Sequence, residues 1–185
     1  MKPIKILGVV GSLRNGSYNK ALIRAAMALK PEDTVIEIFD IGGIPPFNQD
    51  LEKNPPEIVK KFKATIKAAD ALLIATPEYN YSVPSVLKNA IDWASRPYGD
   101  NAFAGKPVAI MSASVGSLGG ARAQYHLRQI LLALDMYPLN RPEVMLPFAN
   151  ESVDAEGNLT NEKTKRLIRE LLEALVTWTW KLKSS

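Results

Sequence analysis

Short apolar runs alternate along the chain with segments whose apolar residues recur every three or four positions. The first pattern predicts buried strands, and the second predicts amphipathic helices packed on a sheet. The predicted strands are Ile4 to Val10, Val35 to Phe39, Ala71 to Thr76, Val108 to Ala113 and Val144 to Leu146. The predicted helices are Asn19 to Leu29, Glu57 to Ala69, Pro84 to Ala94, Ala121 to Leu134 and Asn161 to Leu182.

This alternation predicts a single α/β domain over residues 1–185, built as a three-layer sandwich. Five strands suit the flavodoxin-like fold, with a parallel sheet of order 2-1-3-4-5 and helices on both faces. The longest irregular stretch is Gly42 to Pro56, and a loop of that length is usually functional or part of an interface. In the last helix an apolar stripe favours a core face over a membrane-surface face. Its members are Leu167, Leu171, Leu175, Trp178 and Leu182.

The composition narrows the kinds of partner and chemistry. Apolar residues make up 46% and charged residues 23% of the chain, which is typical of a globular domain. The net charge of +4 comes without a basic run interleaved with aromatics, so we expect no nucleic-acid partner. With no cysteine, any redox chemistry requires a bound cofactor. The N-terminal residues predict neither a signal peptide nor a membrane span, so we expect a cytoplasmic protein.

A parallel sheet of this order binds ligands beyond the carboxyl ends of its strands, where the strand order reverses. The loop after the first predicted strand is Gly11-Ser12-Leu13-Arg14-Asn15-Gly16-Ser17-Tyr18-Asn19. Its small residues, hydroxyls, guanidinium and following helix suit a phosphate. The loop lacks the lysine of a Walker A motif and the three glycines of a dinucleotide fold, which favours a monophosphate. An ordinary turn with Ser17 as helix N-cap stays open as the alternative.

Two further loops follow the third and fourth predicted strands. The first, Thr76 to Pro84, holds Pro77, Glu78, Tyr79, Asn80 and Tyr81, a set able to lie against a flat ring and to bond its edge. The second, Ser112 to Gly120, offers small residues, including Ser114, that permit close approach of a ligand. Tyrosine, asparagine and glycine are also common in simple turns, so the argument depends on all three loops together.

Three motifs resemble the NAD(P)H-dependent FMN reductase family, and most closely its chromate and quinone reductase branch. They are Gly11-Ser12-Leu13-Arg14, the run from Pro77 to Pro84 continuing into Leu87-Lys88-Asn89-Ala90-Ile91-Asp92-Trp93, and Gly119-Gly120-Ala121-Arg122. The resemblance spans roughly Ile4 to Pro147. It implies FMN as cofactor and NADPH or NADH as electron donor. The acceptors it implies are small molecules such as quinones, chromate or other metal oxyanions, and azo compounds.

The resemblance also implies roles for individual residues. Ser12 to Asn19 would hold the FMN phosphate, chiefly through Ser12, Arg14, Ser17 and Asn19. Pro77 and the run from Glu78 to Tyr81 would edge the isoalloxazine, with Ser114 beside it. We expect no catalytic side chain, because hydride transfer at flavin N5 belongs to the cofactor, and we expect donor and acceptor to bind in turn, a ping-pong scheme.

Several other residues carry weaker expectations. Arg96 could attract an anionic donor or acceptor, or it could be a solvated cation at a helix end. By resemblance, Arg122, Tyr125 and Glu143 are candidates for contacts in a dimer or tetramer, with intramolecular pairing as the alternative. The single histidine, His126, indicates packing or interface use, since the chain has no nucleophile elbow and no metal-ligand spacing.

Two other functions fit the same fold. A flavodoxin-type electron carrier would bind FMN and depend on a protein partner, but such carriers are typically strongly acidic, whereas this chain is positively charged. A ligand-free interaction domain is the other alternative, because fold alone does not determine function.

Overall fold

The strands and helices lie where the hydrophobic pattern predicts them, within a few residues at each end. A computed structural model describes residues 2–184 of the chain. The strands are β1 (Ile4–Val10), β2 (Thr34–Phe39), β3 (Ala71–Thr76), β4 (Pro107–Ala113), β5 (Tyr137–Pro138) and β6 (Val144–Leu146). The helices are α1 (Tyr18–Leu29), α2 (Glu57–Ala68), α3 (Ser85–Ala94), α4 (Ala121–Ala133) and α5 (Glu162–Lys183), with short 3-10 helices η1 (Gln49–Leu51) and η2 (Ala149–Glu151).

The sheet is parallel and has the order β2-β1-β3-β4-β5, which confirms the flavodoxin-like prediction. The last position of the sheet differs from the prediction, because two short strands share it. β5 pairs with the start of β4, where Pro107 faces Tyr137, and β6 pairs with its end, where Met111 faces Val144. The predicted strand at Val144–Leu146 is therefore the second half of an interrupted edge.

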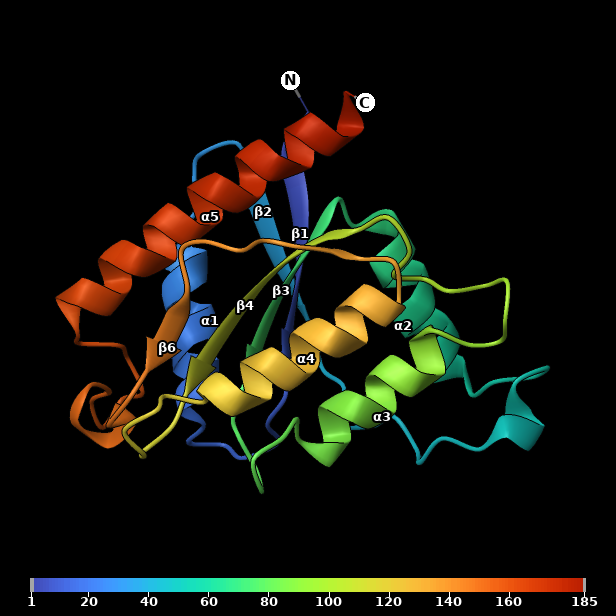
Figure 1. Cartoon of the computed structure of the whole chain (residues 1–185), viewed down its shortest axis with the longest axis horizontal. Helices are drawn as coiled ribbons and strands as arrows, with labels where there is room; N and C mark the ends of the chain where they lie inside the picture. The colour runs from blue at the N-terminus through green and yellow to red at the C-terminus, as the bar shows by residue number, and fades with distance from the viewer. Residues whose placement is uncertain (1, 185) are drawn as a thin grey trace.

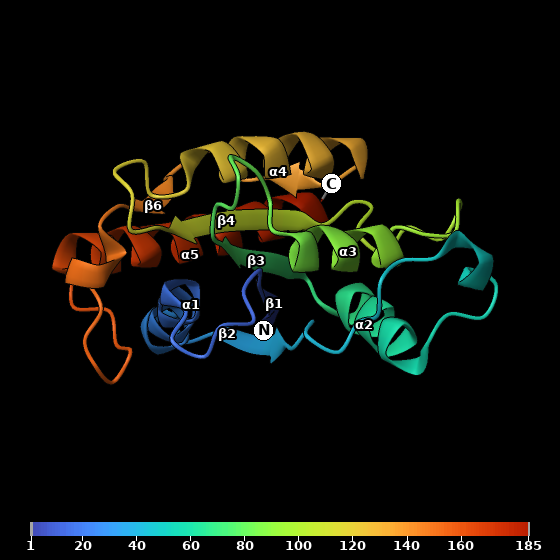
Figure 2. The same cartoon turned by 90° about the horizontal axis from the view of Figure 1, so that it is seen from below.

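Helices cover both faces of the sheet, as Figures 1 and 2 show. One apolar cluster joins α1 and α5 to one face of the sheet, and the other joins α2, α3 and α4 to the opposite face. The two central strands, β3 and β4, are buried along their whole length, which explains their continuous apolar sequence.

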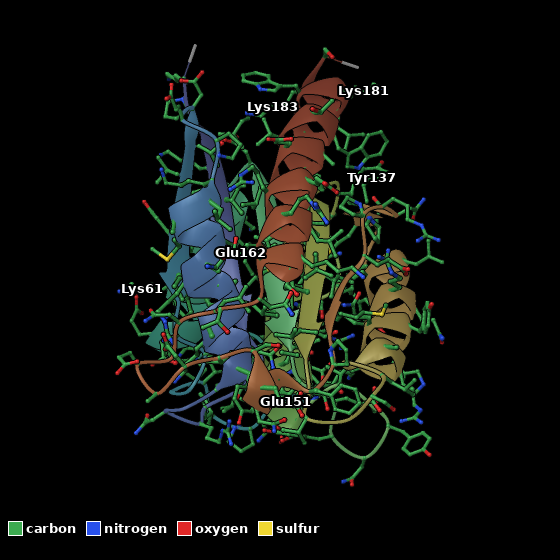
Figure 3. All side chains as sticks on the ribbon, turned by 90° about the vertical axis from the view of Figure 1, so that its left-hand side faces the viewer. Lys61, Tyr137, Glu151, Glu162, Lys181 and Lys183 are labelled. Atoms are coloured by element: carbon green, nitrogen blue, oxygen red, sulfur yellow. The ribbon has the colours of Figure 1, made fainter. Side chains whose placement is uncertain are left out.

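Helix α5 runs across one face of the sheet beside α1, from Glu162 near its start to Lys183 near its end (Figure 3). Of its predicted core stripe, Leu171 and Leu175 are buried, whereas the other three residues are only partly buried. The buried face also includes Ile168, Leu172 and Thr179, so it is rotated slightly from the predicted stripe.

The irregular stretch from Gly42 to Pro56 is fixed to α3. Asn89 accepts a hydrogen bond from the backbone N–H of Phe47 at 2.7 Å and donates to the carbonyl of Pro45 at 2.9 Å. The indole N–H of Trp93 donates to the same carbonyl at 2.8 Å, and its ring meets that of Phe47 edge-on. Two side chains of α3, Asn89 and Trp93, therefore hold this stretch in place.

Candidate functional site

The loops after β1, β3 and β4 gather at one end of the sheet, the end onto which Figure 2 looks. They enclose an open cavity of about 210 Å³. Nine of the predicted site residues line it, together with Ala113 and Val115: Ser12, Arg14, Ser17, Tyr18, Asn19, Pro77, Glu78, Tyr79 and Ser114. The other predicted residues of these loops, Leu13, Asn15, Gly16, Asn80 and Tyr81, lie next to the lining residues along the chain but do not line it.

The first loop, Ser12–Ser17, presents polar groups that the rest of the chain leaves free. Ser12 and Ser17 are each only 5% exposed, and within residues 2–184 neither hydroxyl has a hydrogen-bond partner. None of the backbone N–H groups of this loop donates a bond to another described residue. Both serines line the cavity, so these free donors are available there to a ligand that accepts hydrogen bonds.

The start of α1 also favours an anion at this loop. Ser17 occupies the N-cap position but makes no capping hydrogen bond, and the first turn holds no acidic residue. Ser17 is therefore the N-cap by position, and the choice between an ordinary turn and a phosphate loop stays a prediction. The positive end of the helix dipole is left for an external anion at the same place as the free hydroxyls.

Arg14 and Asn19 are partly engaged by the chain itself. The guanidinium of Arg14 donates to the carbonyl of Gly16 at 2.5 Å and lies 4.9 Å from the centre of the Tyr18 ring, so it is folded over its own loop. The amide of Asn19 exchanges two hydrogen bonds with the backbone of Ala113, at 3.0 and 3.1 Å. Asn19 thus fixes the start of α1 to the end of β4.

The second loop is a tight hairpin turn. Tyr79 and Ser82 exchange backbone hydrogen bonds at 3.0 and 3.1 Å, and the two residues between them, Asn80 and Tyr81, have φ of 48° and 67°. Asparagine tolerates this left-handed conformation, whereas a tyrosine there costs about 1 kcal/mol. The turn holds Tyr79 and Tyr81 half or more exposed beside the cavity.

The carboxylate of Glu78 lies at the cavity and is bonded to the start of α4. One carboxylate oxygen accepts the backbone N–H of Arg122 at 2.9 Å and that of Ala123 at 3.3 Å, and the other accepts the Arg122 guanidinium at 2.8 Å. Glu78 is therefore the N-terminal cap of α4, supplied from a different loop. The guanidinium of Arg122 also lies 3.8 Å from the centre of the Tyr81 ring. These contacts join the second loop to the start of α4.

The third loop, Ser114–Gly120, requires its final glycines. Gly119 and Gly120 have φ of 58° and 87°. A Cβ atom on Gly119 would lie 2.9 Å from the backbone of Met145 and Leu146, and one on Gly120 would lie 2.8 Å from Ser112. The loop therefore packs directly against β6 and β4, which leaves the side chain of Ser114 at the cavity.

Sequence reasoning missed the buried network that sets this loop. Gln124 is fully buried and donates to Ser112 Oγ at 2.8 Å and to the carbonyl of Val144 at 2.9 Å, and Ser112 in turn donates to the carbonyl of Gly119 at 2.6 Å. A signal was present, because Gln124 is a polar residue in the stripe that continues as Leu127 and Leu131.

Arg96 lies away from the cavity. It follows the far end of α3, where its Nε donates to Glu52 Oε1 at 2.6 Å and its guanidinium lies 3.8 Å from the centre of the Tyr98 ring. The bond to Glu52 raises the pKa of Arg96 above its ordinary value. Arg96 connects α3 to the Gly42–Pro56 stretch, and its contact with a substrate stays a prediction.

The candidate subunit contacts have intramolecular partners or are exposed. Arg122 pairs with Glu78, and Glu143 lies 3.3 Å from Arg141, whereas Tyr125 is 52% exposed. His126 lies on the surface of α4, and its Nδ1 is 3.0 Å from Ser82 Oγ. Within residues 2–184 we find no cluster of metal-ligating side chains and no helix long and apolar enough to cross a membrane.

The residues at the cavity fit FMN. Free N–H groups, two serine hydroxyls and a helix end without a side-chain cap suit a phosphate. The hairpin with its tyrosines and the glycine-rich loop suit a flat ring. The two kinds of lining therefore match the two ends of FMN, a phosphate and a flat ring.

Comparison with known proteins gives a consistent result. Residues 4–151 match the NADPH-dependent FMN reductase family. The chain is 54% identical over 181 residues to an NAD(P)H-dependent FMN reductase of Pseudomonas aeruginosa, covering 97% of each chain. It is 45% identical over 175 residues to a 2-hydroxy-1,4-benzoquinone reductase of a Burkholderia species, covering 95% of this chain and 96% of that one.

Among solved structures, the chain is similar to the flavoenzyme NAD(P)H:(acceptor) oxidoreductase FerB of Paracoccus denitrificans. The TM-score is 0.88 and the sequences are 38% identical, over 96% of this chain and 98% of the other. The family match covers the three loops and the sheet that positions them. This chain belongs to the NADPH-dependent FMN reductase family.

Proposed function

We propose that this protein is an FMN-dependent NAD(P)H oxidoreductase that reduces quinones. The observation that carries the proposal is the first loop, where the hydroxyls of Ser12 and Ser17, the backbone N–H groups and the start of α1 have no partner in the described chain. Bound FMN supplies the transfer of electrons from a nicotinamide donor to an acceptor. The relatives named as FMN and quinone reductases support this choice of cofactor and acceptor.

The side chains of the loops divide the binding of FMN between them. Ser12 and Ser17 donate hydrogen bonds to the phosphate, with the N–H groups of residues 12–19 around it, and Arg14 opens from Gly16 to add its positive charge. Pro77 to Tyr81 border the flat ring, and Ser114 lies beside it. In this proposal Glu78 acts through α4, because its carboxylate is already held by Arg122 and Ala123.

The acceptors are small molecules that reach the open cavity. Quinones come first, because relatives of 45% and 38% identity are named for quinone or general acceptor reduction. Metal oxyanions such as chromate and azo compounds are further acceptors in the proposal. We also propose that the protein works in the cytoplasm as a dimer or tetramer, with Arg122, Tyr125 and Glu143 near the contact.

The test begins with apoprotein titrated with FMN, whose fluorescence reports binding. We expect a stoichiometric complex whose visible absorbance bleaches on anaerobic addition of NADPH or NADH and returns when 1,4-benzoquinone is added. Arg14→Ala should weaken FMN binding about tenfold, because a charge-assisted hydrogen bond to phosphate is lost.

Arg169→Ala is the matched control, since Arg169 is an exposed residue of α5 and lies outside the cavity. It removes the same charge and should leave FMN binding unchanged. A protein that binds no FMN, or a flavin complex that neither nucleotide reduces, would contradict the proposal.

A further inference from the structure

A second cavity adjoins the first at Ser12. It has a volume of about 240 Å³ and lies between α1 and the end of β2. Lys20 and Arg24 of α1 line one side of it, and Ile38 and Asp40 line the other. Ser12 lines both cavities, so both border the loop that we propose for the FMN phosphate.

Two cations at this second cavity have no acidic partner among residues 2–184. Lys20 and Arg24 are four residues apart on α1, a spacing at which like charges face each other and repel. Within the described chain Lys20 has no hydrogen bond or ion pair, and Arg24 donates only to the backbone carbonyl of Gly157. Asp40 accepts the backbone N–H of Gly42 at 2.9 Å and pairs with neither cation. An anion in the cavity would relieve the repulsion.

The rest of the lining is apolar. Ile38 belongs to the edge strand β2 and is 48% exposed, with Phe39 beside it and Val10 and Ile23 also lining the cavity. An exposed isoleucine in the same lining as two cations combines a surface for a flat, weakly polar ring with a site for a phosphate. At the junction, Ser12 is 95% buried by its neighbours, since only 5% of it is exposed, and its hydroxyl has no partner among residues 2–184.

We propose that the second cavity binds the adenylate half of FAD, so that this protein accepts the flavin dinucleotide as well as the mononucleotide. FAD differs from FMN by a second phosphate and an adenosine joined to the FMN phosphate. In this arrangement Ser12 lies at the point of extension, Lys20 and Arg24 bind the second phosphate, and the adenine packs against Ile38. The inference rests on the proposed function, because it requires the FMN phosphate at the first loop.

The test compares the binding of FAD and FMN to the apoprotein by fluorescence titration. We expect the wild type to bind FAD within about thirtyfold of its affinity for FMN. Lys20→Gln should weaken FAD binding about tenfold and FMN binding less than about threefold, because a charge-assisted bond to the second phosphate is lost. Ile38→Trp fills the second cavity and should weaken FAD binding at least about tenfold while FMN binding is retained.

Lys30→Gln is the matched control, because Lys30 is the exposed C-cap residue of α1 and lies outside both cavities. It should change neither affinity. The inference is overturned, with the proposed function intact, if the wild type binds FMN but binds FAD more than about thirtyfold more weakly, or if Lys20→Gln weakens both flavins equally. A protein that binds neither flavin overturns both proposals.

Discussion

The N-terminal ends of α1 and α4 lie at the same edge of the sheet, but they differ in how their backbone N–H groups are capped. At α4 the chain supplies its own anion, because the carboxylate of Glu78 accepts two backbone N–H groups and a guanidinium. At α1 the described chain supplies none, and the hydroxyl of the N-cap residue Ser17 makes no capping hydrogen bond. A helix end costs stability when it is left without partners. The difference therefore marks α1 as the end that a ligand completes and α4 as part of the frame.

Substitution of Gly120 in the third loop and of Gly16 in the first loop should give the largest difference in stability. Gly120→Ala should lower the free energy of unfolding by about 4 kcal/mol, from the left-handed backbone together with the clash against Ser112. Gly16→Ala should change it by less than about 0.5 kcal/mol, because nothing lies within 4 Å of the added Cβ. Urea unfolding of the apoproteins measures both, and similar losses for the two would remove the distinction between frame and ligand loop.

An acidic residue at the N-cap of α1 should raise the stability of the apoprotein and weaken FMN binding. Ser17→Asp places a carboxylate at the N-cap and should raise the stability of the apoprotein by about 0.5–1 kcal/mol. It should weaken FMN binding about a hundredfold, because two negative groups then share the site. Ser17→Asn tests the cap without the negative charge. It should keep the capping part of the gain in stability and weaken FMN binding about tenfold. Unfolding curves and flavin titrations give the two quantities, and unchanged FMN affinity in Ser17→Asp would place the phosphate elsewhere.

Weakening the cap of α4 should act on stability first. Glu78→Gln should cost about 2 kcal/mol in the free energy of unfolding, because charge-assisted bonds to Arg122 and Ala123 become neutral or are lost. Glu143→Gln, at an ion pair whose arginine is 82% exposed, should cost less than about 0.5 kcal/mol and serves as the control. Equal losses in the two variants would show that Glu78 does not cap α4.

The smallest effect concerns the stacking of Arg122 on Tyr81. Arg122→Ala should lower the free energy of unfolding by about 1 kcal/mol, from a half-exposed ion pair and a cation–π contact. Arg122→Lys keeps the charge but loses the planar stack, so it should recover only part of this loss. Thermal or urea unfolding distinguishes the two, and full recovery in the lysine variant would show that the stack contributes nothing.

The sequence was sufficient for the order of the elements and for the loops that converge, because both follow from periodicity and from the geometry of parallel sheets. It was insufficient where a residue's partner is distant in the chain. Glu78 and Arg122 are separated by 44 residues, so the pattern around Glu78 predicts a ring contact and not a helix cap. The strand Tyr137–Pro138 has two residues and therefore no periodicity to detect. Lys20 carries no signal in the sequence, because a single lysine on a helix is usually a solvated surface residue.

The interrupted strand at one edge of the sheet bears on aggregation. β5 and β6 pair with opposite ends of β4 and are separated by residues 139–143, so that edge presents no long row of unpaired backbone groups to a second molecule. The other edge is β2, a continuous strand of six residues on which Val35 and Ile38 are exposed. Intermolecular strand pairing, if this protein is driven to it by heat or high concentration, should begin at β2 and not at the interrupted edge.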